Sequence, residues 1–325
     1  MKKKSISEVM EKYSIFIVLL FMIILCTILN KNFLSAGNVS NIMKQLAVPT
    51  ILAYGEMLLI ISGMLDLSSG SVLALAGVLS ISSYKATGSL LVGLLVAVVI
   101  AVVCNLINSL MVTNFQAPPF IATLAMQMVA RGIALFFTKG QNILQLNKYT
   151  VFGQGELGPI PISIIFMIVI TVFIWYILRH TRFGRSLYAI GGNEEAAVAS
   201  GINVKKNKYL VFILNGILVG ISGVLFMSRV NAGLPNGALG YEMEGLTAAI
   251  VGGTSFSGGV GTTLGTLAGA FIIGCLNNIM NLIGVDSYIQ QIIKGVIIAL
   301  AVIWDIQSKN KKTNRVILVE AKEKA

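Results

Sequence analysis

The sequence predicts an all-α polytopic membrane protein with about ten transmembrane segments, and three observations lead to this fold class. Of the 325 residues, 56% are hydrophobic and only 11% are charged, whereas soluble proteins carry about 25% charged residues. The hydrophobic residues form long runs, and the mean hydropathy of the chain is +0.85. Basic residues gather at the ends of these runs and in both tails, as they do on the cytoplasmic side of membrane proteins.

Each predicted segment is close to the length at which a helix crosses a bilayer, which is about 20 residues. In chain order the segments are 14–30, 45–62, 70–86, 89–112, 119–138, 160–179, 208–230, 242–254, 261–283 and 288–305. An even number of segments returns the chain to the side on which it starts. We therefore expect a transmembrane domain over 14–305 between two cytoplasmic tails, 1–13 and 306–325.

The first apolar run follows a basic start, as in a signal peptide. No small-x-small cleavage motif directly follows the run, so we expect a retained signal anchor. The net charge of +11 does not indicate a nucleic-acid partner, because the basic residues lie at span ends and in the tails. The cysteines Cys26, Cys104 and Cys275 are scattered through apolar segments without metal or redox spacing, which favours buried, inert thiols.

Catalytic chemistry is not indicated. The glycine-rich stretch 252–261 lacks the Lys-Ser/Thr end of a nucleotide-binding loop. The single histidine, His180, stands beside Arg179 at a span end, where an interfacial role is the simplest interpretation. No nucleophile–base pair and no metal-site spacing stands out, so we do not expect an enzyme.

Two stretches interrupt the apolar pattern at membrane depth. Residues 63–71 are GMLDLSSGS and residues 252–263 are GGTSFSGGVGTT. Irregular backbone survives there only where protein or a water-filled cavity satisfies its polar groups. Similar helix starts follow both breaks, at 70–79 and 261–271, and matched glycine-interrupted segments indicate a transporter with half-helices and internal repeats. Small residues that allow close helix packing are the alternative explanation.

Glu56 lies in the apolar context ILAYGEMLLII, where an acid costs about 3 kcal/mol on insertion scales. We expect it to face the bundle interior, towards Arg131 or Lys294, either as a pathway charge or as half of a buried structural pair. Asp66, with Ser68 and Ser69, can cap the helix that starts near Gly70.

Asparagines form two further polar groups inside spans, and amides suit the passage of a hydroxyl-rich neutral solute. They serve equally as hydrogen-bonding groups between helices. The members are Asn105, Asn108, Asn277, Asn278 and Asn281. We assign a translocation pathway to Glu56, Asp66, Ser68, Ser69, Asn277, Asn278 and Asn281.

The central loop, 180–207, contains the sequence YAIGGNEEAAVASGI and has basic residues on both flanks: Arg179, Arg182, Arg185, Lys205, Lys206 and Lys208. Asn193 is a favourable N-cap, Glu194 and Glu195 suit the positive helix end, and Gly201 can end the helix. We expect one short helix over about 193–203, on the cytoplasmic face. Such a helix is marginal alone, so it indicates a docking element, with an ordinary solvated loop as the alternative.

These residues resemble a known family. Glu195-Ala196-Ala197-x-x-x-Gly201 is similar to the EAA-x-x-x-G signature of ABC-importer permeases, whose short coupling helix docks into a cleft of the ATPase. The strings GMLDLSSGS, YAIGGNEEAAVASGI, GALGYEMEGLTAAIVGGTSFSGGVGTTLGTLAGAFIIGCLNN and QQIIKGVIIALAV narrow the resemblance to ribose-type (monosaccharide) permeases. The resemblance runs from about residue 45 to 305. Branched-chain amino-acid and nucleoside permeases are related, with central loops less similar to GGNEEAA.

The resemblance implies a homodimeric permease in the bacterial inner membrane that carries a monosaccharide such as ribose. ATP and Mg would be bound by a separate cytoplasmic ATPase, usually one chain with tandem cassettes, so we expect no cofactor on this chain. An extracytoplasmic solute-binding protein would deliver the sugar, and 139–158 and 231–242 are expected to contact it. The positions implied for ATPase docking are Gly191, Gly192, Asn193, Glu194, Glu195, Ala196, Ala197 and Gly201.

Two other functions stay open at this point. An ion-gradient-driven secondary transporter would use charged residues at the midplane, such as Glu56, Arg131 and Lys294. A sensory membrane protein would dock a soluble partner through the central loop without carrying any solute.

Overall fold

The computed structural model describes the backbone from residue 6 to 323 and the side chains of 14–303 and 305–307. Lys2, Lys3 and Lys4 of the predicted N-terminal tail, and Lys324 of the C-terminal tail, lie outside the described residues. The elements in chain order are α1 (Ile6–Leu29), α2 (Ala36–Ile61), α3 (Ser69–Thr87), α4 (Leu90–Thr113), α5 (Pro119–Thr138), η1 (Asn147–Thr150), α6 (Val151–Gln154), β1 (Glu156–Leu157), β2 (Ile160–Pro161), α7 (Ile162–His180), α8 (Arg182–Gly192), α9 (Glu194–Ala199), α10 (Val204–Val230), α11 (Tyr241–Val251), α12 (Thr263–Leu282) and α13 (Ser287–Glu323).

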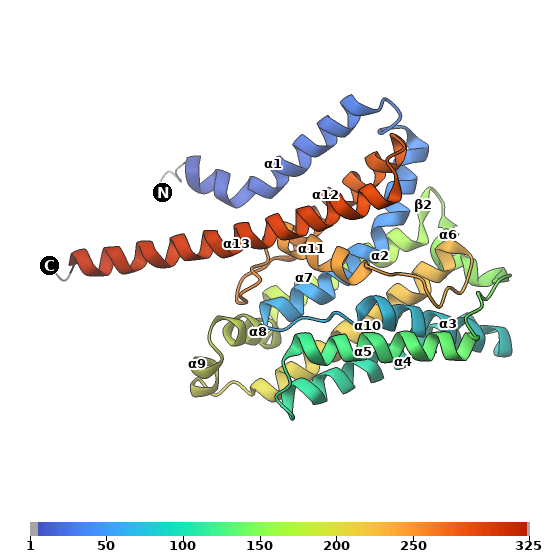
Figure 1. Cartoon of the computed structure of the whole chain (residues 1–325), viewed down its shortest axis with the longest axis horizontal. Helices are drawn as coiled ribbons and strands as arrows, with labels where there is room; N and C mark the ends of the chain where they lie inside the picture. The colour runs from blue at the N-terminus through green and yellow to red at the C-terminus, as the bar shows by residue number, and fades with distance from the viewer. Residues whose placement is uncertain (1–5, 324–325) are drawn as a thin grey trace.

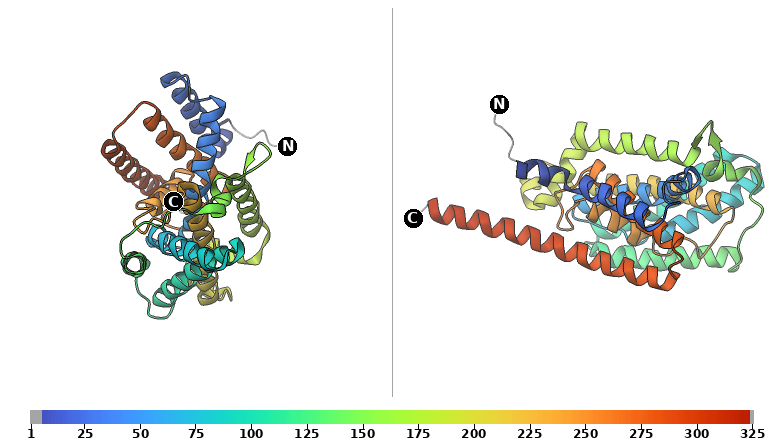
Figure 2. Two further views of the ribbon diagram at one scale, coloured as in Figure 1. Left: turned by 90° about the vertical axis from the view of Figure 1, so that its right-hand side faces the viewer. Right: turned by 90° about the horizontal axis from the view of Figure 1, so that it is seen from above.

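Most of the long helices run along one common direction, which gives the molecule two distinct ends (Figure 1). Both termini lie at the end that carries α8 and α9, and α6 and β2 lie at the opposite end. The view from above shows the same separation (Figure 2). We call these the coupling end and the opposite end.

Every predicted segment coincides with a helix, but not every helix is a complete span. Within the described residues, seven helices are long and apolar enough to cross a membrane, and α1 has a shorter apolar part, Ser14–Leu29. The segment predicted over 242–254 is α11, which has 11 residues and, at roughly 16 Å, is too short to cross a bilayer by itself. The chain is thus an all-α multi-pass membrane protein, and the count of ten spans stays a prediction.

The interior is built around α2, whose residues from Leu46 to Ile61 are buried apart from the partly buried Pro49. Helices α7, α10, α11 and α12 pack against it, and α4, α5 and α7 expose apolar faces that suit lipid. In lipid the hydrophobic effect contributes little to helix association. Small residues therefore stabilise the bundle by letting helices pack closely. At Gly220 of α10 an added Cβ would lie 2.7 Å from the Cα of Val98 in α4.

Both predicted breaks are irregular segments between helices. Residues 62–68 connect α2 to α3, and residues 252–262 connect α11 to α12. We call them the first break and the second break. Thr262 ends the second break and caps α12, because its Oγ1 accepts a hydrogen bond from the Gly265 amide at 3.1 Å.

Candidate functional site

A buried polar network surrounds Asp66 in the first break. Its Oδ1 accepts hydrogen bonds from the amide of Ser68 at 2.8 Å and from the Ser68 hydroxyl. Its Oδ2 accepts from the Ser69 hydroxyl at 3.2 Å and from Nδ2 of Asn215 at 2.8 Å. Asp66 therefore satisfies polar groups where α3 begins, as the sequence predicts, and also ties this start to α10.

Glu56 joins the same network, and the predicted partners were wrong. Its carboxylate accepts hydrogen bonds from the Ser69 hydroxyl at 2.9 Å and the Asp66 amide at 3.3 Å. Arg131 instead donates to the backbone oxygens of Pro235 and Gly237, at 2.6 and 2.9 Å. The third residue of the prediction, Lys294, forms an ion pair with Glu244. These oxygens lie in the loop between α10 and α11, and an argument from charge pairing alone could not predict them.

The asparagines fall into two separate groups. Asn108 donates to the Ser68 hydroxyl at 3.0 Å, and Asn105 accepts from Asn215 at 3.0 Å, so both belong to the Asp66 network. The sequence analysis missed Asn215, which lies within the apolar run of α10 and is almost completely buried.

The α12 group has other partners. Asn278 exchanges two hydrogen bonds of 2.9 Å with Asn38, while Asn277 donates to Glu244 and Asn281 accepts from Gln290. The proposed pathway residues therefore do not form one continuous set.

The central loop contains two helices rather than the single one expected. Helix α8 starts after Thr181, whose Oγ1 accepts from the Gly184 amide at 3.0 Å. It ends at Gly192, and Asn193 then caps α9 by accepting from the Ala196 amide at 2.8 Å. The α8 helix was missed because its two C-terminal glycines suggested a loop, although the Thr181 cap is a visible helix-start signal.

Gly201 ends α9 in the conformation that the sequence predicts. Its φ is 80°, which costs a side-chain-bearing residue about 1–2 kcal/mol. The Ile202 amide donates to the Ala197 carbonyl at 3.0 Å and the Gly201 amide to that of Val198 at 2.9 Å. This paired arrangement satisfies the last carbonyls of the helix.

Most of α9 faces outward. Ala197 is its only buried residue and packs with Ile190 and Val204. Lys208 of α10 forms an ion pair with Glu194 at 2.9 Å, while Val198 is 58% exposed. The helix is thus held to the protein along one side and presents the other.

The C-terminal end of α8 contacts both the end of α2 and the second break. An added Cβ on Gly191 would lie 1.8 Å from the Ile61 carbonyl oxygen and 2.7 Å from the Gly259 amide nitrogen. That amide donates to the Ile61 oxygen at 2.9 Å. Only glycine fits at 191, and we call the contact of these three residues the glycine junction.

Tyr188 adds a side-chain contact next to the glycine junction. Its hydroxyl donates to the Gly261 carbonyl at 2.8 Å. Burial raises the pKa of Tyr188, so the hydroxyl keeps its proton at neutral pH. Helix α8 therefore holds the second break by a backbone contact and by a hydrogen bond.

Helix α13 contacts the second break from another side. Oδ2 of Asp305 accepts from the Phe256 amide at 2.9 Å and from the Ser255 hydroxyl at 3.2 Å. No group of three or more His, Cys, Asp or Glu side chains in the described part of the chain is placed to hold a metal ion. Contacts of α8 thus connect α9 to the residue before the first break and to the second break.

Comparison with known proteins identifies the family. A family model described as "Branched-chain amino acid transport system / permease component" matches residues 38–302. The chain belongs to this permease family. Relatives of this permease include the ribose import permease protein RbsC of Bacillus subtilis, 38% identical over 94% of this chain and 95% of the relative. RbsC of Escherichia coli K12 is also 38% identical, over 93% and 94% of the two chains.

The galactose/methyl galactoside import permease protein MglC of Escherichia coli K12 is 34% identical to the permease over 94% of this chain and 97% of the relative. No solved structure matches the chain described here. The resemblance to ABC-importer permeases found in the sequence is confirmed.

Proposed function

We propose that this chain is the permease subunit of an ATP-driven ABC importer for a monosaccharide such as ribose or a related sugar. The observation that carries the proposal is the similarity, over more than nine-tenths of the chain, to permeases named for import of ribose and galactose. A permease named for D-allose transport is 32% identical over 91% of the chain. All three sugars are neutral, hydroxyl-rich solutes.

ATP hydrolysis belongs to a partner in this proposal. The ATPase, with tandem cassettes, binds ATP and Mg, and this chain carries no cofactor. The ATPase docks on the exposed side of α9, which is formed by Glu194, Glu195, Ala196 and Val198. A helix of six residues is marginal by itself, so a cleft on the partner that covers this side would stabilise it.

Movement at α9 would reach the membrane domain through the glycine junction. Closure of the ATPase moves α8 and α9, and the backbone contact at Gly191 carries this movement to Ile61 and Gly259. Ile61 directly precedes the first break and Gly259 lies in the second. Because packed elements shift between discrete arrangements rather than deforming continuously, movement at both breaks can alternate access to the pathway.

The opposite end supplies the contact with a solute-binding protein. Segments 139–158 and 231–242 were expected to meet it, and they are joined here by an antiparallel bridge between Ile143 and Gly233. Hydrogen bonds of 2.9 and 2.8 Å link these two residues in both directions. Because the two segments are joined, they support a single docking site for the solute-binding protein on each permease chain. A homodimer would present two such sites.

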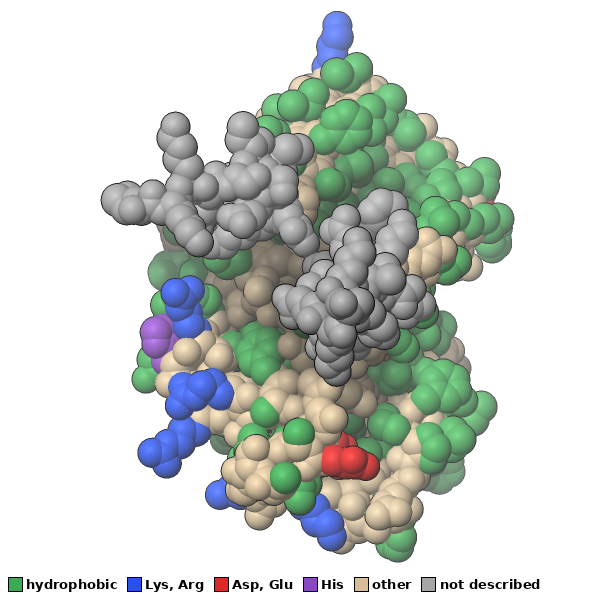
Figure 3. All heavy atoms as spheres, turned by 90° about the vertical axis from the view of Figure 1, so that its left-hand side faces the viewer, with side chains coloured by type: hydrophobic (Ala, Val, Ile, Leu, Met, Phe, Trp, Pro, Cys, Tyr) green, Lys and Arg blue, Asp and Glu red, His purple; other side chains and the backbone are tan. Residues whose placement is uncertain are grey.

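The charge distribution supports the proposed orientation. Lys and Arg side chains gather on the coupling end (Figure 3), where the exposed members include Arg179, Arg182, Arg185, Lys205 and Lys206. Excess basic charge marks the cytoplasmic side. The orientation places both termini, with the tails 1–13 and 306–325, in the cytoplasm, and it includes ten segments in the membrane domain 14–305.

Crosslinking tests the docking surface. Val198→Cys places a thiol on α9, and Leu157→Cys places a matched one on β1 at the opposite end, where Leu157 is 70% exposed. We expect a reagent with one thiol-reactive and one photoreactive group, applied to native membranes, to join Val198→Cys to an ATPase with two cassettes, identified by mass spectrometry, and Leu157→Cys to join none. Absence of any ATPase adduct at position 198 would contradict the coupling role of α9.

A further inference from the structure

We propose that the corner between α7 and α8 binds the headgroup of an anionic phospholipid. Helix α7 is one of the described helices that are long and apolar enough to cross a membrane, so its end at His180 lies near a bilayer surface. Helix α8 starts two residues later, at the coupling end (Figure 1). We call Arg179, His180 and Arg182 the corner site. These residues lie outside the assigned translocation pathway and outside α9, so the site adds a lipid partner to the proposed function.

The exposed side of α7 leads directly to the corner site. Its exposed apolar side chains recur every three or four residues, which places them along one face of the helix. They are Ile168, Val169, Val172, Phe173, Trp175 and Tyr176. Arg179 and His180 continue the same face in the last turn of α7 and are also exposed. An acyl chain that packs along this face therefore brings its headgroup to the corner site.

Aromatic rings indicate the depth of the corner site in the bilayer. The ring of His180 stacks on Tyr176, with ring centroids 5.4 Å apart, and makes a T-shaped contact with Trp175 at 5.1 Å. Trp and Tyr concentrate at the level of the lipid headgroups. These rings therefore place the neighbouring guanidinium groups among the headgroups rather than in the hydrocarbon.

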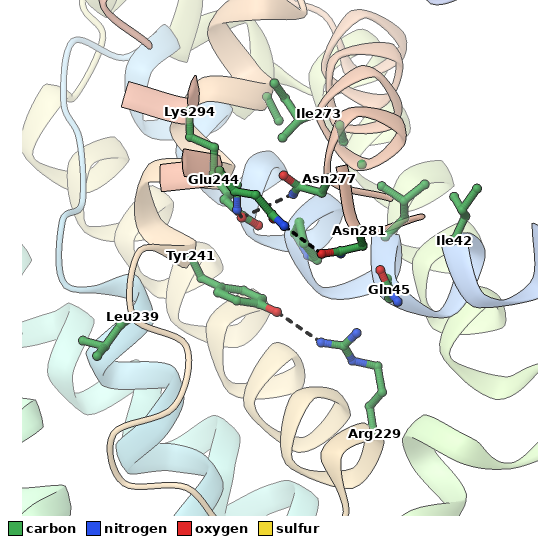
Figure 4. Close-up of a pocket in the computed structure, with 16 residues that line it drawn as sticks. Ile42, Gln45, Arg229, Leu239, Tyr241, Glu244, Ile273, Asn277, Asn281 and Lys294 are labelled. Carbon is green, nitrogen blue, oxygen red and sulfur yellow. Dashed lines mark hydrogen bonds and ion pairs between the residues drawn. The ribbon is translucent and has the colours of Figure 1, made fainter. Parts of the chain in front are cut away.

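Within the described part of the chain, the arginines of the corner site have no counter-ion. The ion pairs found there join lysines to glutamates, and neither arginine takes part in one. Two other bases of the membrane domain do have partners (Figure 4). Lys294 pairs with Glu244. Arg229 donates to the Tyr241 hydroxyl at 3.1 Å. The corner site therefore offers charge and hydrogen-bond donors to an anion from outside the chain.

The geometry of the corner site suits a phosphate group. Arg179 and Arg182 are three residues apart, so their Cα atoms lie within about 11 Å of each other and their long side chains can reach one phosphate. A guanidinium group binds phosphate oxygens through two parallel hydrogen bonds. The positive end of α8 starts at the same place, and its first turn contains no acidic side chain. In Figure 3, Lys and Arg side chains gather around the single histidine at one edge of the coupling end, where surrounding lipid can reach them.

Native mass spectrometry of the full-length purified chain, titrated in detergent with phosphatidylglycerol or phosphatidylcholine, tests the corner site. We expect tighter binding of phosphatidylglycerol, and a loss of at least about tenfold in its affinity when Arg179→Gln and Arg182→Gln are combined, because two basic contacts with the headgroup are removed. The matched control combines Lys205→Gln and Lys206→Gln. It removes the same charge from exposed positions at the start of α10, a span that is 78% buried and offers little surface to an acyl chain. This control should keep the wild-type affinity for phosphatidylglycerol.

Four other outcomes would overturn the corner site. Equal affinity of the wild type for the two lipids would remove the role of headgroup charge. An equal loss of affinity in the arginine and lysine variants would show attraction to net charge rather than to a site. Displacement of phosphatidylglycerol by an equal concentration of glycerol 3-phosphate would indicate a free phosphate ligand without a role for the acyl chains. Unchanged lipid affinity in the arginine variant, with loss of a co-purifying ATPase, would show that the arginines dock a protein.

Discussion

Gly191→Ala is the substitution for which the structure gives the sharpest expectation. The added Cβ would lie 1.8 Å from the Ile61 carbonyl oxygen, and a normal C···O contact of about 3.3 Å requires the backbones to separate by roughly 1.5 Å. Overpacking of this kind costs about 1–3 kcal/mol. Separation also breaks the hydrogen bond between the Gly259 amide and Ile61, which contributes about 1 kcal/mol.

A cost of about 2 kcal/mol corresponds to more than a tenfold change in an equilibrium. We therefore expect Gly191→Ala to lower sugar uptake by cells at least about tenfold while the chain stays in the membrane, as measured by immunoblot. Gly132→Ala in α5 is the matched control, because an added Cβ there meets nothing within 4 Å, and uptake should stay near the wild-type rate. Wild-type uptake by Gly191→Ala would refute transmission through the glycine junction.

Three further predictions concern α9 and the Asp66 network. Asn193→Ala removes the cap of α9, costs about 1 kcal/mol of helix stability, and should reduce co-purification of the ATPase, whereas Asn193→Ser should retain it; equal recovery of ATPase would contradict the capping role. Gly201→Val strains a residue with φ of 80° by about 1–2 kcal/mol, and it should abolish uptake at normal membrane levels, as should Glu195→Lys. Normal uptake by both would contradict docking through α9. Asn215→Leu leaves the buried carboxylate of Asp66 short of one donor and should destabilise the purified chain by about 1–3 kcal/mol, and an unchanged melting temperature would show that the network is not structural.

The helices could be predicted from the sequence because their signals are local. Apolar runs, the cap at Asn193 and the C-terminal glycine at 201 each depend on residues within a few positions of one another. The boundary of α11 shows where this fails, since the predicted segment ran to residue 254 and the helix ends at Val251, before Gly252 and Gly253. Length of hydrophobic sequence does not reveal where a helix stops inside a protein-lined region.

The site was predicted only in part, because its contacts join residues far apart in the chain. Glu56 was expected to pair with a cation, yet the Asp66 amide of the first break and the Ser69 hydroxyl at the start of α3 donate to its carboxylate. The meeting of Gly191 with Ile61 and Gly259 links three segments through backbone atoms. Backbone contacts leave no pattern of side-chain types, so only the folded structure reveals them.

The central claim is that a partner ATPase drives solute through this chain. Its most direct test is ribose uptake by cells that express the chain with its partner proteins, measured after ATP depletion and, separately, after the ion gradients are dissipated while ATP is maintained. We predict that ATP depletion abolishes uptake and that loss of the gradients leaves it intact. Uptake that persists without ATP and collapses with the gradients would contradict the account and indicate a secondary transporter.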